Sequence, residues 1–260
     1  MIGLVRAELL KLTTTRLWWV MLLVTLFLIG VNLAVFIGFA GNPQGGLPAL
    51  DTPEWGQLAL SAGSSGKIFV MILGVVMLTS EYRYQTITGT FLTTPQRGRV
   101  IAAKLLAGLI VGALFALAVL IFTALIVIPT VLIAGGELSL TELRVPQIGL
   151  GTVASLALYA ILGIALGALV RNQIAGIVGA VAWAYVIESV FLAIPALQVV
   201  GKWFPGGAAQ ALMNIDVNTG MNTGMGTDML PPWGGAIVLV GYAVVFAVVA
   251  SATTVRRDIT

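Results

Sequence analysis

The stretch EYRYQTITGTFLTTPQRGR, residues 81–99, lies between two long apolar runs and holds four charged residues. Charge is scarce in the rest of the chain, because 9% of the 260 residues are charged and 59% are hydrophobic. A soluble domain has about a quarter of its residues charged. The excess of apolar residues therefore predicts a membrane protein, in which residues 81–99 connect two membrane-spanning helices.

Six apolar runs are long enough to cross a bilayer, which takes about 20 helical residues. The sequence thus predicts an all-α polytopic membrane protein that forms a single domain over residues 1–260. The third run is too long for one straight crossing, so we expect it to tilt, to kink near Pro129 or to extend outside the bilayer. The six runs cover residues 17–39, 58–80, 100–133, 148–170, 174–200 and 234–255.

The cations are distributed unevenly between the two sides of these spans. An excess of Lys and Arg at span ends marks the cytoplasmic side of a membrane. We therefore predict that both termini and residues 81–99 are cytoplasmic, and that residues 201–233 form an extracellular loop. Ten of the 13 cations share the predicted cytoplasmic side, namely Arg6, Lys11, Arg16, Arg83, Arg97, Arg99, Lys104, Arg171, Arg256 and Arg257.

Residues 1–16 precede the first span and combine apolar residues at helical spacing with charged residues between them. This pattern predicts an amphipathic helix lying in the inner membrane interface. A plain anchor before a membrane helix is the alternative interpretation. We expect an uncleaved anchor and not a signal peptide, because the apolar run that follows is too long. The apolar set is Ile2, Val5, Leu9 and Leu12, and the charged set is Arg6, Glu8 and Lys11.

The connector between the second and third spans has a pattern of its own. Tyr84, Ile87 and Phe91 fall on one face of a short predicted helix, and Pro95 ends it. Such a helix, held by a span at each end, is suited to docking a cytoplasmic partner. The alternative is a solvated connector that only follows the bias of cations toward the cytoplasm.

Two segments resemble the permease subunits of type-2 ABC exporters. They are RAELLKL at residues 6–12 and SEYRYQTITGTFLTTPQRGRVIAAKLLAG at residues 80–108. In that family a Glu ends the second span, and Thr, Leu, Pro and Arg follow before a Lys that leads the third span. FPGGAAQALM at residues 204–213 is also similar to the segment before the last span of such permeases. The positions that match the series are Glu81, Thr86, Leu92, Pro95, Arg97 and Lys104.

The resemblance implies the transmembrane subunit of an exporter in the bacterial cell membrane. Two permease subunits, identical or related, would work with two cytoplasmic ATPase subunits, and ATP and Mg would be bound by those ATPases. Residues 81–95 would contain the coupling helix that sits in a cleft on the ATPase. Glu81 would either cap that helix, where a carboxylate complements the dipole, or pair with a nearby cation. The expected coupling residues are Glu81, Arg83, Tyr84, Thr86, Leu92, Pro95 and Arg97.

The residue types in the chain exclude most catalytic chemistry. It contains no His and no Cys, the commonest general base and a common nucleophile. SAGSSGKIF at residues 61–69 departs from a phosphate-binding loop, because Ser61 replaces the first Gly and Ile68 follows Lys67. We expect no catalytic residue, metal or cofactor in this chain. The net charge of +3 is too small to indicate a nucleic-acid partner.

Two charges, Lys67 and Glu188, fall inside predicted spans at similar depths, about 20 Å from the inner face. A lone charge there costs at least about 2.5 kcal/mol by insertion scales. We hypothesise that the two residues pair or face a polar cavity with Ser61, Ser64 and Ser65. Otherwise Lys67 extends toward water and Glu188 is protonated. A second functional hypothesis, an ATP-independent carrier or membrane binding subunit, would use these two charges as its site.

Two further features concern helix packing and the outer loop. Gly108/Gly112 and Gly163/Gly167 form GxxxG patterns, which favour close helix packing within the chain over a dimer seam. AAQALM at residues 208–213 predicts one or two helical turns at the outer interface. The rest of residues 201–233 is rich in Gly, Asn and Thr and favours turns. An outer gate and a mobile loop are both open interpretations of that segment.

Overall fold

The computed structural model describes residues 1–42, 46–86, 96–137, 139–213 and 230–255, without the side chains of Arg97, Pro195 and residues 250–255. The described residues form helices and contain no β-strand. Six helical segments within them are long and apolar enough to cross a membrane. These observations confirm the predicted all-α, six-span membrane protein.

The spans follow the predicted order, and two of them consist of more than one helix. The first span is α2 (Leu17–Gly38), and the second joins α3 (Pro53–Ser61), η1 (Ala62–Gly66) and α4 (Lys67–Arg83). The third and fourth are α6 (Arg97–Ile133) and α7 (Val145–Val170). The fifth joins α8 (Gln173–Val181), η2 (Ala182–Ile187) and α9 (Glu188–Ala193), and the sixth is α12 (Pro232–Val255). Shorter helices are α1 (Ile2–Thr13), α10 (Pro195–Gly201) and α11 (Pro205–Met213).

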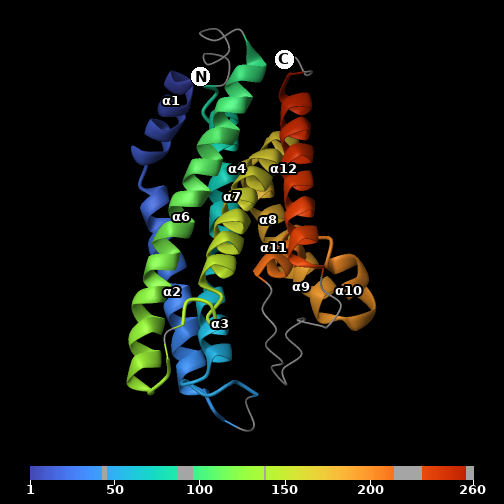
Figure 1. Cartoon of the computed structure of the whole chain (residues 1–260). Coiled ribbons are helices and arrows are strands. Elements are labelled where there is room, and N and C mark those ends of the chain that lie inside the picture. Colours follow the sequence, from blue (N-terminus) through green and yellow to red (C-terminus); the bar gives the residue numbers. More distant parts are fainter. Residues whose placement is uncertain (43–45, 87–95, 138, 214–229, 256–260) are drawn as a thin grey trace.

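The third span remains one continuous helix through Pro129. At about 1.5 Å per residue, its 37 residues extend roughly 56 Å, well beyond the roughly 30 Å hydrocarbon core. Figure 1 shows α6 running along most of the length of the bundle, from the end near α1 to the opposite end near α3. The helix is therefore longer than a straight crossing of the hydrocarbon core requires.

Helix α7 is the central element of the bundle. In the most apolar 18-residue stretch of α7, 72% of the residues are buried. In the corresponding stretches of α2 and α12, 17% are buried. Glycines allow the close approach of its neighbours: a Cβ built on Gly163 would overlap the backbone of Met71 in α4, and one on Gly112 would overlap the backbone of Ala157 in α7. Both GxxxG patterns thus serve packing within the chain, as the sequence predicted.

Two spans differ from their predicted bounds by five residues or more. The second span begins five residues early, at Pro53, where the Thr52 hydroxyl accepts a hydrogen bond from the backbone N–H of Trp55 and caps the helix. The fifth span was predicted to reach residue 200 but ends at Ala193. Ile194 is extended (ψ 116°), as a residue before proline prefers, and α10 starts a new helix at Pro195.

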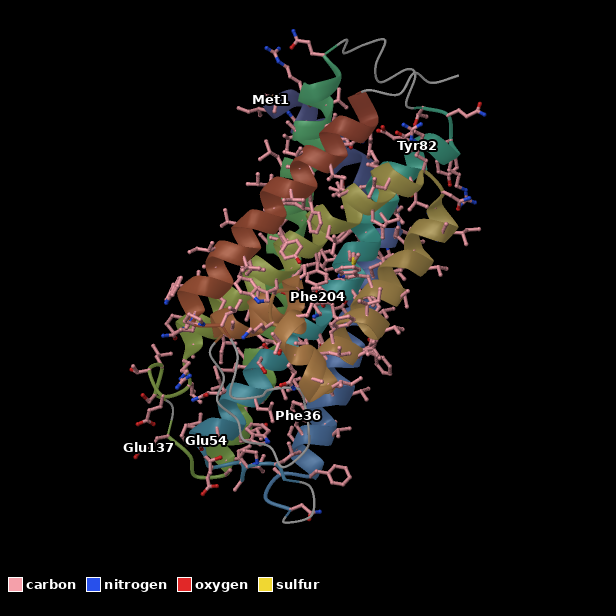
Figure 2. All side chains as sticks on the ribbon, turned by 90° about the vertical axis from the view of Figure 1, so that its right-hand side faces the viewer. Met1, Phe36, Glu54, Tyr82, Glu137 and Phe204 are labelled. Atoms are coloured by element: carbon pink, nitrogen blue, oxygen red, sulfur yellow. The ribbon has the colours of Figure 1, made fainter. Side chains whose placement is uncertain are left out.

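Helix α11 is the largest departure from the expected outer loop. Most of its residues are buried, and its Ala208 and Ala209 pack with Leu158 of α7 and Leu239 of α12. Figure 2 shows Phe204, just before α11, near the middle of the length of the bundle. The prediction that residues 208–213 lie at the outer interface is therefore wrong, because the small residues of α11 (Gly206, Gly207, Ala208, Ala209 and Ala211) are buried and let the helix enter the bundle.

The two ends of the bundle carry different parts of the chain. Met1 and Tyr82 lie at one end, and Phe36, Glu54 and Glu137 lie at the other (Figure 2). The C-terminal end of α12 lies at the same end as α1 (Figure 1). We call the end with Met1 and Tyr82 the inner end. This arrangement agrees with an even number of membrane crossings.

Candidate functional site

Four charged side chains meet at the inner end of the bundle, and we call them the inner charge cluster: Glu8, Lys11, Glu81 and Lys104. The Lys104 Nζ donates to Glu8 Oε2 and to Glu81 Oε1, both at 2.7 Å. The Lys11 Nζ donates to Glu8 Oε1 at 2.8 Å and to Glu81 Oε1 at 2.7 Å. The cluster joins three helices, α1, α4 and α6, through two cations and two carboxylates.

Most of the inner charge cluster is shielded from solvent. Glu8 is 6% exposed, Glu81 4% and Lys104 1%, whereas half of the Lys11 side chain is exposed. Burial disfavours the ammonium form of Lys11, but the hydrogen bonds that it donates to Glu8 and Glu81, together with the charges of these two residues, outweigh this effect and raise its pKa. Lys11 therefore stays charged at physiological pH.

Glu81 is held in place by the way that α4 ends. Gln85 adopts a left-handed conformation (φ 57°). The backbone N–H of Gln85 donates to Tyr82 O and that of Thr86 to Glu81 O, the two bonds of a Schellman motif. Glu81 therefore lies in the last turn of α4, where the helix dipole is unfavourable for a carboxylate. The structure contains the ion pair with neighbouring cations that was one of the two roles expected for Glu81. The helix that Glu81 would otherwise cap lies mostly outside the described residues.

A second group of polar residues surrounds Glu188 deep in the bundle, and we call it the Glu188 network. Glu188 Oε2 accepts hydrogen bonds from Lys67 Nζ at 3.1 Å and from the hydroxyl of Tyr159. Glu188 Oε1 accepts from Trp183 Nε1 at 3.1 Å and from the backbone N–H of Gly206 at 3.3 Å. Glu188 is 1% exposed, so four donors replace the water that its carboxylate has lost.

The sequence model of one protein family matches residues 4–189, more than half of the chain; its description is "ABC-2 family transporter protein". The chain belongs to the ABC-2 transporter family. No curated protein matches the chain significantly. The matched region contains the whole inner charge cluster together with Lys67 and Glu188. The predicted resemblance to ABC-2 permeases is confirmed, and this chain is a multi-pass membrane permease of that family.

Glu8 has a different environment from the one predicted for it in this ABC-2 protein. We expected Glu8 on the polar face of an interfacial helix. Glu8 is instead buried, because α1 packs on α6 and α4 through Leu12, Val5 and Leu9, three of the residues predicted on its apolar face. The interfacial position of α1 stays a prediction. Lys104 accounts for the burial of Glu8, since it supplies a charged partner inside the contact.

The remaining predicted coupling residues of the ABC-2 chain lie near the inner end or outside the described residues. Arg83 donates to the side-chain oxygen of Gln173 at 3.0 Å, and its guanidinium lies 5.6 Å from the ring centre of Tyr84. Tyr84 is 67% exposed. Leu92 and Pro95 lie outside the described residues, and Arg97 begins α6 with its side chain undescribed. The short helix predicted over residues 84–95 also falls mostly outside them.

The Glu188 network contains residues that the sequence did not indicate. Trp183 lies in η2, whose i→i+5 turns bring residues five apart onto one side, so its indole reaches Glu188. A Cβ built on Gly206 would overlap Glu188 Oε2, so glycine lets the backbone of the chain approach the carboxylate. Ser61 and Ser65 do not join the network, because their hydroxyls donate to Leu58 O and Ala62 O.

The Lys67–Glu188 ion pair can be tested with a double-mutant cycle. We expect the variants Lys67→Met and Glu188→Gln to be coupled by about 0.5–3 kcal/mol in unfolding free energy, because each removes the partner of the other. Denaturant unfolding in detergent micelles measures the coupling. The control cycle replaces Glu188→Gln with Glu142→Gln, since Glu142 is exposed. Equal coupling in both cycles would contradict the pair.

Proposed function

We propose that the chain is the transmembrane subunit of an ATP-driven exporter of the bacterial cell membrane. It would pair with a second permease subunit, and two separate cytoplasmic ATPases would bind ATP and Mg. The inner end would face the cytoplasm, because most cations of the sequence gather at span ends on that side. The observation that carries this proposal is the inner charge cluster, which links the two helices on either side of the connector.

The cluster is suited to receiving force at the connector. Helix α4 ends at Arg83, just before the connector, and α6 begins at Arg97, just after the connector. Glu81 on α4 and Lys104 on α6 share a hydrogen bond, and both bind Glu8 or Lys11 of α1. A displacement of the connector would therefore move three helix ends as one unit.

Helix α4 extends this connection into the membrane. Lys67 is its first residue and belongs to the Glu188 network, whereas Glu81 lies in its last turn. The two positions are fourteen residues apart along the chain, which corresponds to roughly 21 Å of helix. A movement imposed at the inner end would reach the Glu188 network through a single helix that packs closely on α7.

The energy source would be a partner protein. The segment 61–69 that resembles a phosphate-binding loop lies in the helices of the second span, from the end of α3 through η1 to the start of α4. A phosphate-binding loop follows a strand and opens a helix, with free backbone N–H groups. Nucleotide binding therefore belongs to the separate ATPases in this proposal.

The carrier hypothesis finds less support. A carrier that used Lys67 and Glu188 as its site would need polar atoms free to bind substrate or protons. Both oxygens of Glu188 accept two hydrogen bonds each, from Lys67, Tyr159, Trp183 and Gly206. This arrangement favours a role for the Glu188 network in holding helices together.

The proposal predicts an ATPase that binds through Tyr84. Affinity purification of the tagged chain from its native membrane, followed by mass spectrometry, should recover an ABC ATPase. Tyr84→Ala should reduce that recovery about tenfold, because exposed tyrosines at interface centres contribute strongly to binding. The matched control is Trp233→Ala, since Trp233 is 69% exposed and Tyr84 67%. Absence of any ATPase, or equal losses in both variants, would refute the proposal.

A further inference from the structure

The inner charge cluster borders a pocket of about 290 Å³. The walls of the pocket come from four helices: α1, the start of α2, the last turns of α4 and the start of α8. Ligand pockets usually measure about 300–1,000 Å³, so this one is at the lower end of that range. It has room for a small polar group such as a phosphate or a lipid headgroup, and not for a complete drug-sized molecule.

The pocket is located where three membrane spans end. Arg16 directly precedes the first span, Ser80 lies in the last turn of the second, and Gln173 begins the fifth; all three line the pocket. Val76 and Met77 line it about one helical turn deeper in α4. One side of the pocket is therefore polar, at the membrane boundary, and the other side is apolar, toward the hydrocarbon core.

The carboxylates in the lining of the pocket are already bound. Glu8 and Glu81 are 6% and 4% exposed, and each accepts hydrogen bonds from Lys11 and Lys104. One oxygen, Glu81 Oε2, has no partner among the described residues, but it is buried and does not open into the pocket. The lining that the structure describes thus offers no accessible, unbound carboxylate oxygen to a cationic ligand.

Hydrogen-bond donors, in contrast, remain available around the pocket. Arg16 is exposed, and its guanidinium has no partner in the described part of the chain. The side-chain oxygen of Gln173 accepts from Arg83, which leaves the amide N–H groups of Gln173 unbonded. Lys11 is half exposed and donates two of its three N–H groups to the inner charge cluster. The charged side chains of the lining that water reaches, Lys11 and Arg16, are therefore both cations.

These donors suit a phosphate group. A phosphodiester has one negative charge and several acceptor oxygens, and the N–H groups of an arginine match the geometry of those oxygens. A headgroup that also carries an ammonium would bring a positive charge close to Arg16 and Lys11 and would find no accessible carboxylate. The pocket therefore favours a lipid with a net negative charge over a zwitterionic one.

We propose that this pocket binds the headgroup phosphate of an anionic phospholipid, of the phosphatidylglycerol type. The phosphate would contact Arg16 and Lys11, and the start of the acyl chains would lie along Leu17, Val76 and Met77. This apolar side of the pocket favours a lipid over free phosphate, which would leave it in contact with water. The assignment to the inner leaflet rests on the orientation proposed above, whereas the binding itself does not.

Lipid binding to the purified full-length chain tests the proposal without any ATPase, so the result is independent of the proposed transport function. Native mass spectrometry in detergent would compare phosphatidylglycerol with phosphatidylcholine and phosphatidylethanolamine of identical acyl chains. We expect phosphatidylglycerol to bind roughly tenfold more tightly than either, since the other two carry an ammonium that Arg16 and Lys11 repel. Equal binding, or tighter binding of a zwitterionic lipid, would overturn the proposal. Inorganic phosphate in excess should not displace phosphatidylglycerol; displacement would assign the pocket to free phosphate and overturn the lipid.

Variants test the position of the site. Arg16→Gln should remove most of the preference for phosphatidylglycerol, because it removes the exposed arginine of the pocket. The matched control is Arg6→Gln, which should keep the preference, since Arg6 is an exposed arginine of α1 that does not line the pocket. Both arginines are exposed, so neither substitution disturbs a packed contact. Equal losses in the two variants would indicate a nonspecific basic surface and refute the site.

Discussion

Replacing Lys104 with methionine is expected to lower the free energy of unfolding by about 3–5 kcal/mol, the usual cost of removing one partner from a buried ion pair. Lys104 is 1% exposed and binds both carboxylates of the inner charge cluster. Without it, Glu8 and Glu81 share only Lys11 and face each other with an excess negative charge. Methionine keeps much of the side-chain volume, so the loss reports on charge.

Denaturant unfolding of the purified chain in detergent micelles measures this effect. The matched control is Lys202→Met, because Lys202 lies outside the cluster and has no ion-pair partner among the described residues. Lys11→Met should cost less than Lys104→Met, since half of the Lys11 side chain is exposed and water can replace it. A loss with Lys104→Met no larger than that with Lys202→Met would show that the cluster does not stabilise the fold.

Replacing Gly163 with alanine is expected to lower the free energy of unfolding by about 3 kcal/mol, the upper end of the range for overpacked sites. A Cβ at this position would overlap the carbonyl oxygen of Met71 and lie 3.0 Å from the backbone nitrogen of Val75. Both are backbone atoms of α4, which cannot rotate away as a side chain does. The α4–α7 contact would therefore have to open, and the Glu188 network with it.

Gly149 provides the control on the same helix, since a Cβ built there meets nothing within 4 Å. Gly149→Ala should raise stability by up to about 1 kcal/mol, because alanine favours helix more than glycine does. The two substitutions make the same chemical change but have opposite expected signs. Unfolding in detergent, with monodispersity in gel filtration as a second readout, compares them. Similar stabilities of the two variants would contradict the close α4–α7 packing.

The Lys67–Glu188 pair shows what can be predicted from the positions of residues along the chain. The two residues are 121 positions apart, yet their equal depths in separate spans were enough to suggest that their side chains are in contact. Depth follows from a count of residues from the span ends, because each residue of helix rises about 1.5 Å. Tyr159, Trp183 and Gly206 were not predicted, since their contacts depend on how each helix is rotated about its axis.

Lys104 and Glu8 show the opposite case. They lie 96 positions apart, and the charge pattern assigned both to the inner side without pairing them. Glu8 was predicted on the polar face of an interfacial helix, because the apolar spacing of α1 was interpreted against a membrane surface and not against α6. A polar residue inside a helix contact is recognised only when its partner on the other helix is known.

The sequence alone determined that this chain is a membrane protein with six helical spans, that its cations gather on one side, and that it resembles ABC-2 permeases. These properties depend on the length of apolar runs and on local order along the chain. The tertiary structure decided which charges meet, that α11 enters the bundle, and that α7 is central. The spans are apolar nearly all round, so periodicity does not reveal which face of each helix meets which neighbour.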